Sequence, residues 1–257
     1  MLEAYTLYSG SGGNCIFVSD GETSILIDAG KSQRAIQTAL CSLGRGLESV
    51  SAIFLTHEHS DHTSGLEVIS KCHRIPVYIT APSYANLVKA DSCLSRVAQP
   101  QDVVYQVECG ELKIRSFPIP HDSAQNVGYI ITKGEESVGI ATDMGYVTER
   151  IASELSLCKW VVLESNHDVE MLKKGPYPYY LKQRILSKGG HLSNELCAKL
   201  CVHLAECGVE QITLAHLSRE NNTPDLAYNT SKKALEETGH NIILRVAGAD
   251  TIVKAIG

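Results

Sequence analysis

The 257-residue sequence lacks the features that define membrane and secreted proteins. No stretch approaches the roughly 18 consecutive apolar residues that a membrane-spanning helix needs. The opening residues, Met-Leu-Glu-Ala-Tyr, contain neither the basic nor the apolar part of a secretion signal. Long tracts of proline, glycine or serine and blocks of like charge are also missing. These absences argue against an integral membrane protein and a disordered chain, and we expect one cytoplasmic globular domain over residues 1–257.

Paired-cysteine motifs are missing as well. The nine cysteines are odd in number, scattered, and include no Cys-x-x-Cys pair. This distribution is typical of reduced thiols rather than of a disulfide framework. Cys197 and Cys201 stand four residues apart among leucines at helical spacing, which indicates small core residues.

Positive charge is in deficit. The chain has 23 lysines and arginines against 29 acidic residues, a formal net charge of −6. This balance argues against a protein that coats nucleic acid or membrane by bulk electrostatics, although it allows a local basic surface. A chain of this length buries roughly 70% of its unfolded surface, so it needs no disulfide or structural metal to fold. Any metal site is therefore expected to serve chemistry.

What the sequence does contain is a mixture of strand and helix signals in both halves. Helices are predicted from Ser32 to Gly44, over residues 194–206, and from Thr223 to Gly239, where capping residues and terminal glycines mark the ends. This mixture predicts an α/β sandwich. The predicted strands lie near residues 5–8, 15–19, 24–28, 52–56, 77–80, 103–107, 112–117, 127–132, 138–142, 160–164, 211–215 and 241–246, and the last one closes the series.

Many of these strands run into a side chain that can bind a metal ion. Open α/β sheets place their ligands in a crevice beyond the strand ends. If these ends share one edge, they deliver imidazoles and carboxylates to a single site. The side chains are Asp28, His57, His121, Asp143, Glu164 and His216.

The sharpest motif is Thr-His-Glu-His-Ser-Asp-His at residues 56–62, directly after an apolar strand. In an extended loop His57 and His59 point the same way, because alternate side chains do, so both can bind one ion. Asp61 and His62 then lie where the next helix begins, within reach of a second ion. The motif predicts a two-metal site rather than a merely polar helix start.

Two ions need roughly six to eight protein ligands, so residues far along the chain must complete the set. His121 follows a stiff Pro-Ile-Pro segment, and Asp143 and His216 each follow an apolar strand. We expect all three to be ligands rather than surface polar residues. Two roles stay open for Asp28: a direct ligand, or an acid that orients a ligating histidine.

The expected ligands are imidazoles and carboxylates without thiolate, which fits Zn²⁺, Mn²⁺ or Fe²⁺. Two such ions about 3.5–4 Å apart lower the pKa of a shared water to near 7 and bind the attacked centre. We therefore expect two divalent metal ions as cofactors and hydrolysis as the reaction.

Taken together, these features resemble the metallo-β-lactamase superfamily of dinuclear hydrolases. Six segments look similar to its YycJ/WalJ branch, with one departure at Gly12, where a serine is expected. The resemblance covers most of the chain and implies a four-layer αβ/βα sandwich with the metals at one edge, and a phosphodiesterase, most closely a 5′ to 3′ DNA exonuclease. The segments are residues 9–15, 26–30, 55–62, 164–168, 190–194 and 216–222.

The resemblance also implies individual roles. It places His167 near the scissile phosphate as a proton donor or phosphate contact. It places His191 at the start of a helix whose free N–H groups favour an anion. A capping or surface role is the alternative for both. The implied ligands are His57, His59 and His121 for the first ion and Asp61, His62 and His216 for the second, with Asp143 bridging.

Residues 171–194, called the arm below, bear on the substrate. Basic side chains interspersed with tyrosines are typical of a surface that follows phosphates and stacks on bases, with Lys182 and Arg184 as phosphate contacts. The alternative is a solvated segment whose tyrosines pack inward. The glycine-rich turn at residues 9–13 lacks the lysine of a phosphate loop, and Asn14 beside it is a candidate phosphate contact. The arm has no acidic residue and contains Lys173, Lys174, Lys182, Arg184, Lys188, Tyr177, Tyr179 and Tyr180.

The expected function is a two-metal phosphodiesterase acting on DNA, in which a hydroxide held by the metal ions attacks phosphorus and Asp61 orients it. The alternative is a small-molecule hydrolase of lactone, thioester or β-lactam bonds, since fold alone does not choose between the two. The arm favours the first, whereas a narrow apolar pocket over the metals would favour the second. A regulator without turnover and a redox di-iron protein fit less well, because the ligand positions are intact and a di-iron site would carry an acid in place of His59.

Overall fold

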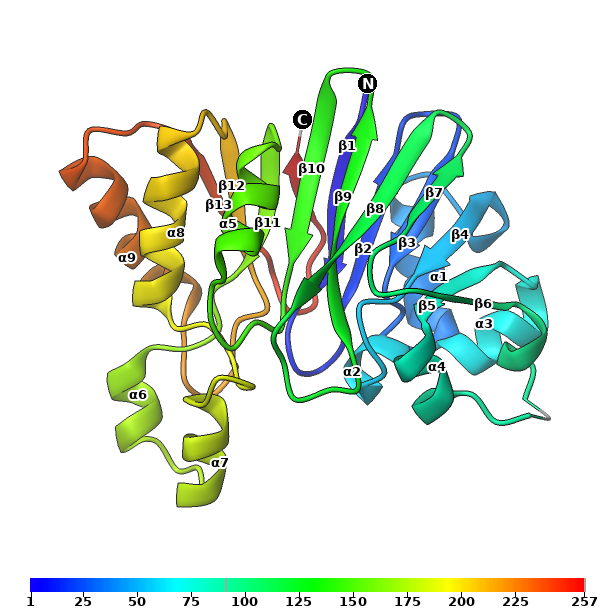
Figure 1. The fold of residues 1–257 in the computed structure, drawn as a ribbon, viewed down its shortest axis with the longest axis horizontal. Coiled ribbons are helices and arrows are strands. Elements are labelled where there is room, and N and C mark those ends of the chain that lie inside the picture. Colours follow the sequence, from blue (N-terminus) through cyan, green and yellow to red (C-terminus); the bar gives the residue numbers. More distant parts are fainter. Residues whose placement is uncertain (91, 257) are drawn as a thin grey trace.

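The computed structural model describes residues 1–90 and 92–256. Its strands form two seven-stranded sheets, ordered β14-β1-β2-β3-β4-β5-β6 and β13-β12-β11-β10-β9-β8-β7. The sheets lie face to face, and helices cover their outer surfaces on both sides (Figure 1). This arrangement confirms the α/β four-layer sandwich predicted from the sequence.

The first sheet combines the N-terminal strands with the last strand of the chain. β3, β4, β5 and β6 run parallel, whereas β1 pairs antiparallel with β2 and β14. Helices α1 (Gln33–Ser42), α3 (Leu66–His73) and α4 (Ala81–Leu87) lie on its outer side (Figure 1). The strands are β1 (Glu3–Tyr8), β2 (Cys15–Ser19), β3 (Ser24–Ile27), β4 (Val50–Phe54), β5 (Val77–Thr80), β6 (Ala98–Gln101) and β14 (Val253–Ile256), and a short 3₁₀ turn, η1 (Leu47–Ser49), precedes β4.

The second sheet changes from antiparallel to parallel at β10. β7 to β10 form an antiparallel meander, and β10 to β13 run parallel. Helices α5 (Glu149–Ser156), α8 (Asn194–Glu206) and α9 (Pro224–Glu237) cover its outer face. The strands are β7 (Gln106–Cys109), β8 (Leu112–Ile119), β9 (Asn126–Lys133), β10 (Glu136–Ala141), β11 (Trp160–Glu164), β12 (Gln211–Ala215) and β13 (Ile243–Val246).

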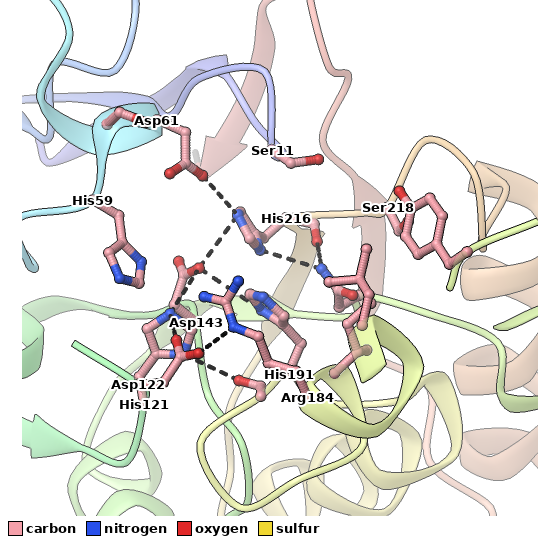
Figure 2. A pocket seen from close by; sticks show the side chains of 16 residues that line it. Ser11, His59, Asp61, His121, Asp122, Asp143, Arg184, His191, His216 and Ser218 are labelled. Atoms are coloured by element: carbon pink, nitrogen blue, oxygen red, sulfur yellow. Dashed lines mark hydrogen bonds and ion pairs between the residues drawn. The ribbon is translucent and has the colours of Figure 1, made fainter. Parts of the chain in front are cut away.

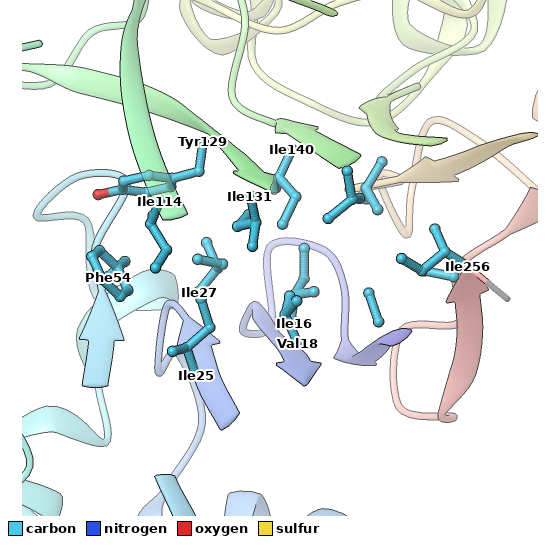
Figure 3. Close-up of a cluster of buried hydrophobic side chains, with 14 of the residues drawn as sticks. Ile16, Val18, Ile25, Ile27, Phe54, Ile114, Tyr129, Ile131, Ile140 and Ile256 are labelled. Atoms are coloured by element: carbon cyan, nitrogen blue, oxygen red, sulfur yellow. The ribbon is translucent and has the colours of Figure 1, made fainter. Parts of the chain in front are cut away.

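Alternation along the strands sorts apolar side chains between the layers. In β3, Ile25 and Ile27 face the other sheet, whereas Leu26 faces the helices. Successive side chains of a strand point to opposite faces, so a wholly apolar strand is buried on both sides. Ile16, Val18, Ile131 and Ile140 belong to the cluster between the sheets (Figure 3), and separate clusters pack each sheet against its helices.

The predicted helix ends are found where the capping residues stand. The Ser32 hydroxyl accepts a hydrogen bond from Ala35 N at the start of α1, and the Thr223 hydroxyl accepts one from Leu226 N at the start of α9. Such caps satisfy backbone donors that have no partner inside the helix. α8 spans Asn194–Glu206, which confirms the helix predicted there. None of the described helices is long and apolar enough to cross a membrane.

Two strand predictions are wrong. The apolar run at residues 103–107 is mostly not a strand: β7 begins at Gln106, and Tyr105 instead packs into the inter-sheet core while its N–H donates to the Ser116 hydroxyl. The strand predicted at residues 241–246 is also not the last strand of the chain, because β14 follows it and pairs with β1. β14 was not predicted from the sequence, and its partner β1 lies at the other end of the chain.

One edge of the sandwich gathers the ends of the parallel strands. Asp28 follows β3, Asp143 follows β10, and His216 follows β12. All three adopt the left-handed backbone region, with φ of 63°, 57° and 56° respectively. Such backbone costs of order 1–3 kcal/mol for a non-glycine residue and clusters at functional sites. The fold therefore brings these three side chains to one edge of the sandwich at a cost in stability.

Candidate metal centre

The histidine motif forms the loop that leaves β4 and the short helix α2 (Ser60–Thr63). His57 and His59 lie in the loop, and Asp61 and His62 lie in α2, as the spacing predicts. The Glu58 side chain points away from the other four. It accepts hydrogen bonds from Ala124 N and the Ser83 hydroxyl, both at 2.7 Å. Glu58 therefore ties the loop to its neighbours while the histidines stay free to face inward.

The first potential metal position is surrounded by three imidazoles. His57, His59 and His121 each present a ring nitrogen within 4.8 Å of the other two. Their ring centroids lie 4.5 to 5.1 Å apart. Three convergent imidazoles form a typical binding site for a divalent transition metal.

The second potential position is formed by Asp61, His62 and His216, whose ligand atoms also lie within 4.8 Å of one another. Asp143 stands between the two positions. Its carboxylate lies 3.3 Å from His62 Nε2. It also lies 3.4 Å from His216 Nε2 and 3.9 Å from His121 Nε2 (Figure 2). The tertiary structure thus brings all seven sequence-predicted ligands together, in the two groups that the resemblance implies.

Unpartnered atoms show that this arrangement fits metal ions. His57 Nε2, His216 Nε2 and Asp143 Oδ2 are buried and make no hydrogen bond within the described residues. Leaving a buried polar atom unsatisfied costs about 1–3 kcal/mol. Three such atoms converge on the same space, and coordination to a divalent ion would satisfy all of them. The residues present therefore fit a metal centre.

Electrostatics favours a cation in this space. Burial, reinforced by the neighbouring histidines, lowers the pKa of His57 well below its usual value, so the ring is a neutral, ligand-competent imidazole. Burial opposes ionisation of Asp143, but His216 and His62 hold its pKa well below the usual range. Burial also opposes protonation of His216, yet Asp143 and Asp61 raise its pKa to about 10. The carboxylates that attract a proton here would equally attract a metal ion.

Asp28 lies behind the metal-facing side chains. Its Oδ2 is 2.8 Å from His62 Nδ1, and its Oδ1 accepts a hydrogen bond from Thr56 N at 2.9 Å. The Thr56 hydroxyl also contacts Asp28 and lies 3.0 Å from His57 Nδ1. Of the two roles left open for Asp28, the structure therefore places it where it orients a ligating histidine, with His62 Nε2 turned toward the crevice.

Glu164 orients histidines as Asp28 does, but it acts on His216 and His191. The site predicted from the sequence does not include Glu164. Its Oε1 lies 2.9 Å from His216 Nδ1 and 2.8 Å from His191 Nδ1. Its Oε2 accepts hydrogen bonds from Met144 N at 2.7 Å and Leu192 N at 3.0 Å. Burial opposes ionisation of Glu164, but His191 and then His216 lower its pKa to about 2. The position of Glu164 at the end of an apolar strand was the signal for it.

A cavity of about 260 Å³ opens beside the ligands. Figure 2 shows His59, Asp61, His121, Asp143 and His216 around it, with His191 and Arg184 beside Asp143. The lining residues that the sequence-based site did not include are mostly polar or from the arm, among them Ser11, Asp122 and Ser218. His191 and Arg184 are thus the predicted substrate contacts that reach this cavity.

Three other predicted site residues lie elsewhere, and none belongs to the described cavity lining. His167 is 1% exposed, and both its ring nitrogens lack hydrogen-bond partners among the described residues; burial lowers its pKa to about 4. Asn14 holds the glycine-rich turn through Gly10 N at 2.8 Å and lies 3.0 Å from His62 Nε2. Lys182 Nζ donates to Lys173 O at 2.7 Å. Their predicted contacts with substrate stay predictions.

The arm contains the helices α6 (Val169–Lys174, which begins just before it) and α7 (Tyr179–Ile185). Three of its five basic side chains make ion pairs, and they share two acids. Lys173 and Lys174 both pair with Glu170, just outside the arm, at 3.2 Å. Arg184 pairs with Asp122, the residue after His121. Tyr179 and Tyr180 do not pack inward, being 76% and 74% exposed, whereas Tyr177 is half-buried and lines the cavity. The arm therefore offers exposed aromatic surface together with an excess of positive charge.

The fold and the site together define a metal-dependent hydrolase. Comparisons with known proteins support this class. The sequence profile of the Beta-lactamase superfamily domain matches residues 23–217, so the chain belongs to the β-lactamase superfamily. "Exodeoxyribonuclease YycJ" of Bacillus anthracis is 34% identical over 245 residues, covering 94% of this chain and 92% of that protein. "Exodeoxyribonuclease WalJ" of Streptococcus pneumoniae is 34% identical over 235 residues, covering 90% and 87%.

Solved structures give the same fold. The metallo-β-lactamase fold protein YhfI from Bacillus subtilis superimposes with a TM-score of 0.72, covering 98% of this chain and 99% of that one, at 15% identity. Identity this low supports the architecture alone. The family predicted from the sequence motifs, including its YycJ/WalJ branch, is confirmed by the curated relatives.

Proposed function

We propose that this chain is a 5′ to 3′ DNA exonuclease that uses two divalent metal ions, Zn²⁺ or Mn²⁺, and acts in the cytoplasm. The observation that carries the proposal is the pair of ligand groups joined by Asp143, in a chain 34% identical to two proteins named exodeoxyribonuclease. The nine free cysteines agree with a reducing compartment.

The seven ligands divide between two ions. His57, His59 and His121 would hold the first, Asp61, His62 and His216 the second, and Asp143 would contact both. When bound, the ions supply a water ionised near neutral pH and positive charge opposite the phosphate oxygens. Asp28, Thr56 and Glu164 fix the ring orientations of the histidines, so the ligands need little rearrangement.

Two further side chains at the cavity would act on protons. Asp61 is 24% exposed there, and its neighbours His216 and His62 overcome partial burial and lower its pKa well below the usual range. Its carboxylate can accept a hydrogen bond from the attacking water and orient it. Burial opposes protonation of His191, but Glu164 raises its pKa. With Nδ1 engaged by Glu164, the opposite nitrogen of His191 can donate a proton to the leaving oxygen.

The rival is a small-molecule hydrolase of lactone, thioester or β-lactam bonds. One observation favours it: part of the cavity is apolar, through Tyr177, Leu181 and Ile185. A nucleotide also presents an apolar base next to a charged phosphate, however, so this surface suits DNA as well.

The experiment is a substrate comparison with purified Mn²⁺-loaded protein. We expect 5′-phosphorylated DNA to be degraded from its 5′ end, EDTA to stop the reaction and added Mn²⁺ to restore it. His59→Ala should lower the rate by about 10³-fold or more, because a ligand of the first ion is lost.

The matched control is His203→Ala, which removes an exposed histidine on the outer surface of α8. It should leave the rate within twofold of the unaltered protein. Turnover of a lactone or thioester with no degradation of DNA would replace the proposed function by its rival.

A further inference from the structure

A second cavity, of about 560 Å³, lies apart from the metal centre and shares no described lining residue with the cavity there. Its walls come from the end of α3 and from the residues around a short 3₁₀ turn, η2 (Leu94–Arg96). α3 and the arm helix α7 lie on opposite sides of α2 (Figure 1). Ligand pockets typically have volumes of roughly 300–1,000 Å³, so this cavity has room for a ligand as large as a nucleotide. The lining residues are Ser70, Lys71, Arg74, Cys93, Arg96 and Val97.

The cavity gathers positive charge. Three of its side chains are basic, and none of the described lining residues is acidic. Most lysines and arginines of the chain pair with an acid within the described residues, whereas Lys71, Arg74 and Arg96 do not. Like charges repel one another, so three unpaired cations around one cavity are unfavourable unless an anion joins them.

The acid that would ordinarily neutralise Lys71 is engaged elsewhere. Glu67 lies four residues before Lys71 in α3, which is the favoured order and spacing for an ion pair on a helix. Its carboxylate instead accepts hydrogen bonds from Cys93 N at 2.7 Å and Leu94 N at 3.2 Å. These two bonds hold the start of η2 against α3 and leave the Lys71 ammonium available to a ligand.

Arg74 occupies a backbone position that favours glycine. It is the C-cap of α3 and has a φ of 53°. Helices commonly end with a glycine in this left-handed region, because a side chain there is strained. The chain therefore keeps an arginine in the cavity wall at a cost in stability. The helix dipole favours Lys71 and Arg74 at the end of α3, but it does not account for Arg96, which comes from η2.

A buried hydroxyl completes the polar lining. Ser70 is 3% exposed, and its Oγ makes no hydrogen bond within the described residues. A serine inside a helix often bonds the carbonyl one turn earlier, so this hydroxyl remains free to donate to a ligand. The walls on which these groups stand are firm, because Ile69 of α3 and Leu94 of η2 are both buried in the core between the first sheet and its helices.

We propose that this cavity is a second anion-binding site, in which Lys71, Arg74 and Arg96 hold a phosphate group. The Ser70 hydroxyl donates a further hydrogen bond to it. Lysine and arginine are the side chains with which proteins recognise phosphate, and hydrogen bonds between ionised groups are the strong ones. The phosphate belongs either to the backbone of DNA or to a free nucleotide. The site does not depend on the proposed function, since it shares no described lining residue with the metal cavity.

Cys93 is a reporter inside the cavity, because its thiol is free, half-buried and part of the lining. The Mn²⁺-loaded protein is treated with iodoacetamide, and peptide mass spectrometry follows the alkylation of each cysteine. The probes are 5′-dAMP and a DNA duplex with phosphorothioate ends, which resist degradation. A probe that enters the cavity, at about ten times its Kd, should slow alkylation of Cys93 by about tenfold. The exposed Cys207 of the same molecule should react at an unchanged rate.

Variants test the cations one at a time. Lys71→Gln and Arg96→Gln should each raise the Kd of the probe by about tenfold, because each removes a charged hydrogen bond. Lys199→Gln, at an exposed lysine of α8, is the matched control and should leave the Kd within twofold. Arg74→Gly should also raise the Kd, yet it should keep or raise Tm because glycine relieves the left-handed backbone. Unfolding cannot explain weaker binding in a variant whose Tm has not fallen.

The two probes distinguish the sources of the phosphate. Protection of Cys93 by the duplex alone assigns the site to the DNA backbone, and protection by 5′-dAMP alone assigns it to a free nucleotide. Absence of protection by both probes overturns the inference, as does equal protection by NaCl at the same ionic strength. Protection that is unchanged in Lys71→Gln and Arg96→Gln also overturns it. None of these outcomes requires DNA to be degraded, so the proposed function is tested separately.

Discussion

The metal-binding edge and the arm are built in opposite ways, although they face the same cavity. At the edge, most ligands are buried, and Asp28, Thr56 and Glu164 hold three of the rings from behind. In the arm, α7 has no buried residue and is held mainly by one ion pair and close backbone contacts. Catalysis needs side chains that are fixed to within a fraction of an ångström. A flexible substrate can adapt its own conformation, so the helix that contacts it does not need to be held as rigidly.

The largest effect should come from the residue between the two ligand groups. We expect Asp143→Asn to lower the rate of DNA degradation by about 10³-fold or more, because one carboxylate contacts histidines of both groups. Metal content, measured by mass spectrometry after dialysis, should fall as well. Asp225→Asn, in the exposed first turn of α9, is the matched control and should change neither quantity. A fully active Asp143→Asn protein would show that the edge does not work as a two-metal site.

A smaller loss is expected behind the ligands. Glu164→Gln keeps the shape but leaves one acceptor oxygen for four donors, so His191 and His216 lose their common partner. Such orienting residues are typically worth 10- to 100-fold in metal affinity or activity. Competition with a chelator measures the affinity of the second ion. Unchanged affinity would mean that strand geometry alone fixes His216.

The arm should give weaker effects still. Arg184→Ala removes the pair with Asp122, whose partners are 56% and 31% exposed, and such pairs contribute about 1 kcal/mol or less. We expect KM for an oligonucleotide to rise by about fivefold or less, with metal affinity unchanged. Limited proteolysis should cut the arm faster. A loss of bound metal in this variant would show that the arm, and not only the metal-binding edge, contributes to metal affinity.

The smallest effect lies outside both regions, where the Arg115 guanidinium hydrogen-bonds Glu154 and lowers its pKa. A carboxyl with a lowered folded pKa stabilises the protein above its unfolded pKa of about 4.3 and loses that contribution as the pH falls through the folded value. The difference in Tm between the unaltered protein and Glu154→Gln should therefore be present at pH 7 and shrink below pH 4. We expect about 1 kcal/mol or less at pH 7, and activity unchanged. A difference that grew on acidification would contradict the ion pair.

Much of the edge was predictable from the sequence because its signals are local. Two histidines spaced by one residue in a loop share a direction whatever surrounds them, so residues 56–62 carried the motif by themselves. Apolar strands ending in Asp143 and His216 were also visible, since parallel strands of one sheet end at one edge. Glu164 gave the same signal, but only the contacts to His191 and His216 distinguish an orienting acid from a ligand.

Other features depended on partners distant in the chain. His167 and Asn14 stand in promising segments, yet both are buried outside the described cavity lining. The basic composition of residues 171–194 suggested free charge, which pairing with Glu170 and Asp122 reduces in part. No pattern along the chain reports which acid will lie beside which base.

By itself, the sequence determined which residues can bind metal and that they stand at strand ends, because strand alternation and loop spacing act over a few residues. The tertiary structure alone decided that Asp28 and Glu164 stand behind the ligands, that β14 joins β1, and that Tyr177 and Leu181 line the cavity. Those outcomes depend on how two sheets and an exposed helix pack against each other. Such packing joins residues separated by most of the chain.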